Sequence, residues 1–198
     1  MDISLRMKSW QVFILLFVLP ALIQILYFYH LVFEEINDLN HILRSFSLLM
    51  LVFMVIYMFW FWAQGIGLNN IVPRNIRPGS GLFRFSIIYT AVYSILFQFY
   101  FLSASISNID SLFIVLGVLI HILGIYCGIY MVYFIARSMV MAEKKKIVEF
   151  SEFSSVFILL GIYPIGLWFI QPRINTIYEE NKNRGYTADI PGHYRSME

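Results

Sequence analysis

The stretch LFIVLGVLIHILGIYCGIYMVYFIA, Leu112–Ala136, decides the fold of this chain. It contains no Asp, Glu, Lys or Arg. It also exceeds the roughly 20 apolar residues that a helix needs to cross about 30 Å of bilayer hydrocarbon. Because backbone polar groups in lipid must be satisfied within their own segment, the stretch predicts a transmembrane helix.

Three further segments meet the same requirements of length and composition. They cover residues 10–33, 46–66 and 85–105, and the first of them is interrupted by Pro20, where we expect a kink. The apolar runs are continuous and do not alternate with polar residues, which argues against a membrane β-barrel. The sequence therefore predicts an all-α integral membrane protein, with residues 1–177 as a single transmembrane helical domain.

The composition of the whole chain agrees with a membrane location. Its 198 residues are 60% hydrophobic and 13% charged, against about 45–50% and about 25% in soluble proteins. A net charge of +2 is too small to indicate a nucleic-acid partner, so the expected environment is the lipid bilayer. The single cysteine, Cys127, excludes an intrachain disulfide and a cysteine-only zinc site. We expect no metal and no cofactor.

The distribution of basic residues predicts the orientation. Short cytoplasmic loops are enriched in Lys and Arg. One set of connections carries Arg6, Lys8, Arg74, Arg77, Arg84, Arg137, Lys144, Lys145 and Lys146. The connections on the other side carry Glu34, Glu35, Asp38 and Asp110, with Arg44 as their basic residue. We therefore expect the N-terminus in the cytoplasm.

A fifth apolar segment, residues 154–170, allows two interpretations. It is barely long enough to span a bilayer, it contains Gly161, Pro164 and Gly166, and Pro172 closes it. It either enters and returns as a proline-broken re-entrant hairpin or forms a short fifth span. A hairpin would leave the following tail on the cytoplasmic side and would have to be covered by the other helices. The polar tail, residues 178–198, is expected to have no fixed fold.

Two blocks of sequence carry a resemblance. WAQGIGLNNIVP (Trp62–Pro73) and YPIGLWFIQPRIN (Tyr163–Asn175) resemble a family of uncharacterised small bacterial polytopic inner-membrane proteins. The resemblance implies a bacterial inner (cytoplasmic) membrane location. It implies no activity and no catalytic residue.

Polar residues inside the predicted spans are the first candidates for function, because such residues are costly in lipid. Gln24, Gln98 and His121 are all expected near the bilayer centre, as judged from a helical rise of 1.5 Å per residue. Two amides and an imidazole at one depth fit either interhelical hydrogen bonds or a path for a proton or a small ligand.

Small residues form stripes on two of the predicted spans. Gly117, Gly124 and Gly128 share one helix face with His121, and Ser86, Thr90 and Ser94 share one face with Gln98. Faces of small residues let two helices approach closely. We expect the two stripes to pack against each other, with Gln98 and His121 near enough to bond directly.

The connection PRNIRPGSG (Pro73–Gly81) joins arginines to residues that permit tight turns. Two arginines lie in this connection, Arg74 and Arg77, and Arg84 follows it. These arginines either set the topology or bind an anion such as a lipid headgroup, because the planar guanidinium group suits phosphate.

Function is less determined than fold. The sequence favours a non-enzymatic scaffold or accessory subunit of a membrane assembly, either as a homo-oligomer or with other membrane subunits. A small homo-oligomeric channel, carrier or membrane-permeabilising effector that uses Gln24, Gln98 and His121 is the alternative. A lipid-active enzyme at the cytoplasmic face is a weaker one, because no nucleophile stands beside a base.

Overall fold

The computed structural model describes residues 5–33, 39–103, 111–162 and 165–188, and these residues contain helices and no strand. The first rod comprises α2 (Ser9–Phe13), the π-helical turn η1 (Ile14–Val18) and α3 (Leu19–Phe33). The remaining helices are α4 (Leu39–Ile71), α5 (Gly81–Ser103), α6 (Ser111–Lys144), α7 (Phe150–Gly161) and α8 (Ile165–Ala188). The all-α prediction is confirmed.

Four of these rods are long and apolar enough to cross a membrane: the first rod, α4, α5 and α6. They coincide with the four predicted spans. Two of them continue past the predicted boundaries, since α4 runs on to Ile71 and α6 to Lys144. At 1.5 Å per residue, the 34 residues of α6 reach about 50 Å, which exceeds the hydrocarbon thickness of about 30 Å.

The first rod carries the irregularity expected at Pro20. A proline lacks an N–H group, and its ring collides with the carbonyl of the residue four positions earlier, here Leu16. The π-helical turn η1 includes Leu16 and ends two residues before Pro20. Widening the helix at this point accommodates the proline while the rod continues into α3.

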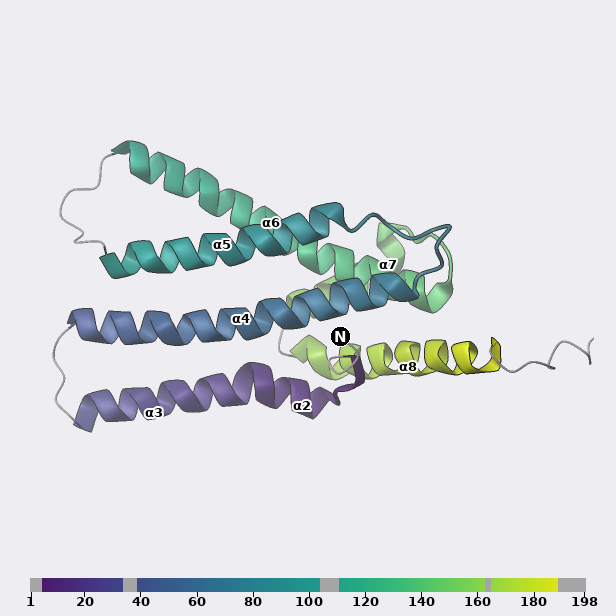
Figure 1. Ribbon diagram of the computed structural model, residues 1–198, viewed down its shortest axis with the longest axis horizontal. Coiled ribbons are helices and arrows are strands. Elements are labelled where there is room, and N and C mark those ends of the chain that lie inside the picture. Colours follow the sequence, from purple (N-terminus) through teal and green to yellow (C-terminus); the bar gives the residue numbers. More distant parts are fainter. Residues whose placement is uncertain (1–4, 34–38, 104–110, 163–164, 189–198) are drawn as a thin grey trace, which may run out of the picture.

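The helices pack tightly at one end only (Figure 1). We call this the basic end: there α2 begins, α4 ends, α5 begins and α6 ends. Most of the fully buried side chains lie in the basic-end parts of α4 and α6, including Ala63, Leu68, Ile135 and Met139. Toward the opposite end α6 diverges from α5, and the described side chains are mostly exposed.

Glycines make the close packing at the basic end possible. The ring of Phe83, from α5, lies directly on Gly65 of α4, so a Cβ atom at that position would overlap the ring. The same ring stacks on Phe134 of α6, with 4.5 Å between centroids. Leu5 lies against Gly67 in a similar way. The residues WAQGIG thus join three helices and the N-terminal segment.

The fifth apolar segment folds as two helices. Helices α7 and α8 pack against each other, and Gly166 lies so close to the Leu159 carbonyl that a Cβ atom there would overlap it. Such a contact requires glycine near the point of reversal. Tyr163 and Pro164 lie outside the described residues.

Contacts along α8 show that it returns to the basic end. Trp168 lies 5.5 Å from Phe13 of α2, measured between ring centroids. Further along α8, the side-chain amide of Gln171 donates to the Met7 carbonyl at 3.0 Å. Tyr178 then lies under the Arg6 guanidinium, at 5.3 Å. Helix α8 therefore runs antiparallel to α2, and the hairpin interpretation is the one the structure adopts.

Two expectations about the C-terminal region are wrong. Pro172 does not close the fifth segment, because α8 continues through it. Helix α8 also extends to Ala188, whereas we expected no fixed fold after residue 177. Gln171 and Asn175 flank Pro172 and both bind the Met7 carbonyl, so packing on α2 holds the helix across the proline. Residues 189–198 lie outside the described part.

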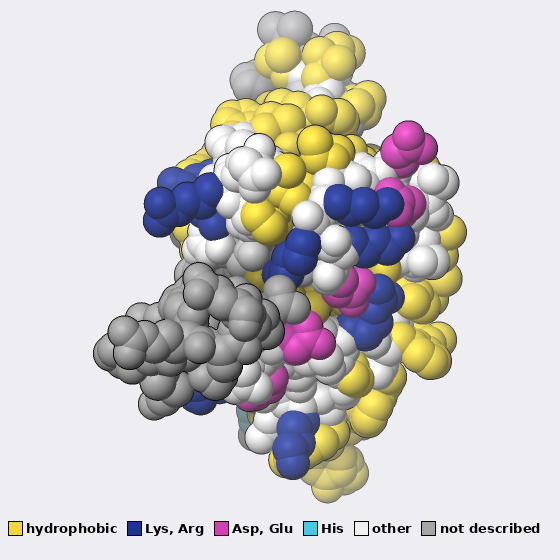
Figure 2. Space-filling view, turned by 90° about the vertical axis from the view of Figure 1, so that its right-hand side faces the viewer, with side chains coloured by type: hydrophobic (Ala, Val, Ile, Leu, Met, Phe, Trp, Pro, Cys, Tyr) yellow, Lys and Arg dark blue, Asp and Glu magenta, His cyan; other side chains and the backbone are white. Residues whose placement is uncertain are grey.

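Charged side chains gather at the basic end, as Figure 2 shows in a view onto that end. Lys and Arg side chains are interspersed there with acidic ones, and hydrophobic side chains cover much of the surface around them. This separation matches a helical bundle embedded in hydrocarbon with one polar end in water.

The contact between Gly65 and Phe83 yields a test of the packing. Gly65→Ala is expected to destabilise the protein by about 1–3 kcal/mol, because the added Cβ atom would overlap the ring of Phe83, which is fully buried and stacked on Phe134. Gly128→Ala is the matched control, since nothing lies within 4 Å of a Cβ atom there. Thermal unfolding of the detergent-solubilised variants measures the difference. Equal melting temperatures for the two would contradict the packing described here.

The antiparallel course of α2 and α8 predicts which residues share a side of the membrane. In a Cys127→Ala background, Lys8→Cys and Lys182→Cys are expected to react with a membrane-impermeant maleimide from the same side. His30→Cys, at the far end of the first rod, is expected to react from the other side. Labelling of Lys182→Cys together with His30→Cys would mean that the fifth segment spans the membrane.

Candidate functional site

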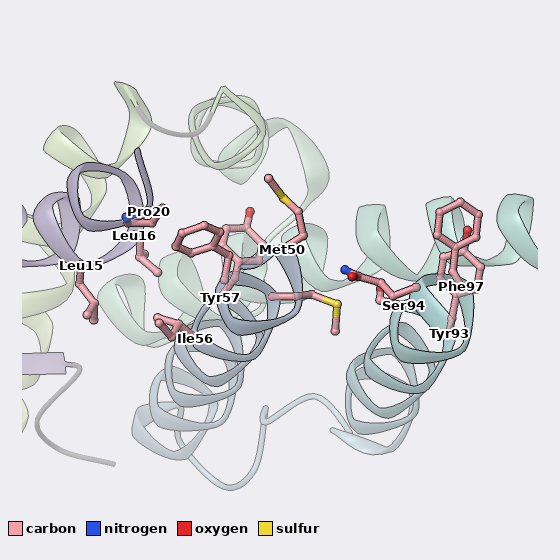
Figure 3. A pocket seen from close by; sticks show the side chains of 12 residues that line it. Leu15, Leu16, Pro20, Met50, Ile56, Tyr57, Tyr93, Ser94 and Phe97 are labelled. Atoms are coloured by element: carbon pink, nitrogen blue, oxygen red, sulfur yellow. The ribbon is translucent and has the colours of Figure 1, made fainter. Parts of the chain in front are cut away.

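A cavity of about 380 Å³ lies among the first rod, α4 and α5 (Figure 3). This volume falls within the roughly 300–1,000 Å³ typical of small-molecule sites. The lining is mainly apolar and consists of Leu15, Leu16, Pro20, Met50, Phe53, Met54, Ile56, Tyr57, Tyr93, Ser94, Phe97 and Gln98. Two of these residues belong to the π-helical turn η1, and such turns are frequent at functional sites.

Gln98 supplies a polar group to this apolar cavity. Its side-chain oxygen Oε1 is buried and accepts no hydrogen bond from the part of the chain that the structure describes. A buried acceptor without a donor costs free energy, about 1–3 kcal/mol in typical cases. The cavity therefore presents one strong acceptor to a molecule that can donate a hydrogen bond.

Tyr93 connects the cavity to the histidine on α6. Its ring lines the cavity, and its hydroxyl group is hydrogen-bonded to Nδ1 of His121 at 2.5 Å. One turn away on α5, the Tyr89 hydroxyl donates to the carbonyl of Ile120 at 2.8 Å. A tyrosine and a histidine in contact can relay a proton, because a hydroxyl group and a neutral imidazole can each both donate and accept a hydrogen bond.

The three predicted midplane residues are therefore not gathered in one place. Gln98 lines the cavity, whereas His121 is bonded to Tyr93. Gln24 lies on α3 outside the cavity lining. The direct bond that we expected between Gln98 and His121 is absent among the described residues: His121 bonds to Tyr93, and Gln98 lines the cavity.

The two small-residue stripes do not form the predicted seam. Gly124 does meet α5, but its neighbour there is the Tyr93 ring, 3.4 Å from an added Cβ atom. Ser94 lines the cavity together with residues of α4, and Ser86 is buried in the core. Thr90 lies between them on the same stripe, with its hydroxyl oxygen buried. Gly117 and Gly128 have no atom within 4 Å of an added Cβ, so this face of α6 is largely open.

Among the three arginines proposed for anion binding, Arg77 has a structural role. Its guanidinium group donates to the Asn70 carbonyl at 2.6 Å and to the Val72 carbonyl at 3.0 Å. It thus satisfies carbonyl groups at the C-terminal end of α4, which a helix leaves without intrahelical partners. Arg74 and Arg84 are exposed.

Ion pairs fix the hairpin to α6. Arg173 of α8 makes two parallel hydrogen bonds to the Glu143 carboxylate, at 2.9 and 2.7 Å. Glu152, in the first turn of α7, accepts from Lys144 at 2.7 Å and lies 3.0 Å from Lys146. Hydrogen bonds from Lys144, Lys146 and the Glu149 backbone lower the pKa of Glu152 to about 2, so its carboxylate stays ionised at neutral pH.

Two residues that matter here were missed by sequence reasoning. Tyr93 sits in an aromatic-rich span, where nothing in the local pattern separates it from Tyr89 or Phe97. Arg137 was interpreted as a topology-setting charge after the fourth span. The structure instead places it within α6, between the buried residues Ala136 and Ser138. The available signal was the continuous apolar pattern on both sides of Arg137.

Among the described residues, no group of three or more His, Cys, Asp or Glu side chains could hold a metal ion. Comparison with protein-family models, with curated proteins and with solved structures gives no match to this chain.

Proposed function

We propose that this chain is a non-enzymatic integral membrane protein that acts as a scaffold or accessory subunit of a membrane assembly. The observation that carries the proposal is the open face of α6. Helix α6 diverges from α5 toward the end opposite the basic end (Figure 1), and no described residue lies within 4 Å of a Cβ atom added at Gly117 or Gly128.

Helix association in lipid relies on close van der Waals contact at small residues, because hydrocarbon supplies no hydrophobic force between helices. Gly117 and Gly128, on which no described residue of the bundle packs, are suited to contact with a helix from another subunit. That subunit is either a second copy of this chain or a different membrane protein.

The proposed orientation places the basic end in the cytoplasm. The gathering of Lys and Arg at this end supports it, because cytoplasmic loops are enriched in these residues. The resemblance of the WAQGIGLNNIVP and YPIGLWFIQPRIN blocks supports a bacterial inner membrane.

Native mass spectrometry of the protein purified mildly from its own membranes tests the assembly. We expect either a homo-oligomer or a second polypeptide at fixed stoichiometry. Gly117→Leu should release monomers, because the new side chain occupies the open face without clashing inside the bundle. Val118→Leu, at an exposed position next to it, is the control. A wild-type protein that is monomeric in mild detergent would refute the proposal.

A second candidate is a small channel or carrier, and the connection between the cavity and His121 favours it. Tyr93 lines the cavity beside the first rod and is hydrogen-bonded to His121 of α6, so polar groups lead from the cavity to α6. A proton or a hydrogen-bonding solute could pass along these groups, with Gln98 as an additional acceptor.

Flux measurements in liposomes separate the second candidate from the first. If the protein conducts protons or a solute, Tyr93→Phe and His121→Ala are expected to abolish the pH dependence of flux. Tyr89→Phe is the control, because it removes a tyrosine hydroxyl group that bonds to a backbone carbonyl. Flux equal to that of protein-free liposomes would exclude the channel or carrier.

A further inference from the structure

Arg137 occupies an unusual position for a charged residue. It lies in α6, about 10 Å along the helix axis from the terminal residue Lys144, at 1.5 Å per residue. Ala136 and Ser138 on either side of it are fully buried. Charged residues at such positions are costly and mark functional sites by default.

Within the described part of the chain, Arg137 makes no hydrogen bond or ion pair, and its Nε atom is buried without an acceptor. Other guanidinium groups are used differently: Arg77 binds backbone carbonyls, and Arg173 binds Glu143. Glu143 and Glu152 are engaged by other cations. Among the described residues, the charge of Arg137 thus has no anionic partner within ion-pair distance.

The depth of Arg137 matches the boundary between hydrocarbon and headgroups. A bilayer of about 40–45 Å with a hydrocarbon core of about 30 Å has headgroup layers of about 5–8 Å on each side. If Lys144 and the Arg173–Glu143 pair lie in water, Arg137 begins just beneath the headgroup layer. Its long side chain can then reach the phosphate groups, as basic residues near helix ends commonly do.

A row of tyrosines continues from Arg137 toward the bilayer centre. Tyr126, Tyr130 and Tyr133 precede it at spacings that place all four residues on one face of α6. Tyr130 stacks with Tyr126 and with Tyr133, at centroid distances of 6.5 and 6.1 Å. Phe153 of α7 lies edge-on to Tyr133, at 5.2 Å. Tyr126 and Tyr130 are not buried, so this aromatic surface is accessible from outside.

We propose that Arg137 and the tyrosine row form a binding site for a phospholipid in the leaflet at the basic end. The guanidinium group of Arg137 binds the phosphate, for which its planar fork is suited. An acyl chain lies along Tyr133, Tyr130 and Tyr126. The site is separate from the exposed Arg74 and Arg84 in and beside the α4–α5 connection, and it does not depend on the scaffold function.

Lipid-induced thermal stabilisation of the purified full-length protein tests the site. A ligand that binds only the folded state raises the melting temperature. We expect phosphatidylglycerol to raise that of the wild type, and Arg137→Gln to lower the affinity for this lipid about tenfold or more. The melting temperature of Arg137→Gln without lipid should match that of the wild type, because Arg137 makes no hydrogen bond or ion pair with the described residues.

Arg74→Gln is the matched control, since it removes one exposed arginine from the same end of the molecule. It is expected to retain the lipid-induced rise. Loss of the rise in Arg74→Gln as well as in Arg137→Gln would show a general surface-charge effect and overturn the site. A full rise in Arg137→Gln would also overturn it. An equal rise with inorganic phosphate would assign the site to a free anion and refute the lipid.

Arg137→Lys keeps the test decisive if Arg137→Gln does not fold. Lysine retains the charge but cannot form two parallel hydrogen bonds to one phosphate. We expect the affinity of Arg137→Lys for phosphatidylglycerol to fall below that of the wild type. An unchanged affinity would contradict the assignment of the phosphate to the guanidinium group.

Discussion

The bundle depends on close contact between helices at glycine, because hydrocarbon gives apolar helices no hydrophobic reason to associate. The ring of Phe83 lies on Gly65 and stacks on Phe134, which joins α4, α5 and α6 at one point. Leu5 lies on Gly67 nearby and adds the N-terminal segment. Toward the opposite end α6 diverges from α5.

The α7–α8 hairpin follows from the same constraint together with the charges around it. Gly166 permits the two helices to meet at the reversal, and α8 then packs along α2. Arg173–Glu143 and Lys144–Glu152 fix the hairpin to the end of α6. One face of the hairpin is thereby buried against the other helices, through Phe153, Leu167 and Ile170, whereas Ile162 and Ile165 beside the reversal are exposed.

The polar side chains within the helices lie in two separate regions of the bundle. Tyr93 connects a cavity between the first rod, α4 and α5 with His121 on α6, whereas Arg137 lies near the basic end beside a row of tyrosines. The sequence around Arg77 suggested an anion-binding site. In the structure, however, the Arg77 guanidinium group donates to a backbone carbonyl at the end of α4. Similar side chains thus have different roles according to the acceptors within their reach.

The sequence by itself determined the four spans, because length and apolarity are local properties that hydrocarbon thickness selects directly. It also identified Gln98, His121 and the α6 glycines as unusual residues for a membrane helix. Only the tertiary structure decided that the fifth segment returns, that α8 passes through Pro172, and that Tyr93 bonds to His121. These outcomes depend on contacts between residues far apart in the chain, such as Met7 with Gln171, and helical periodicity carries no information about which face meets which neighbour.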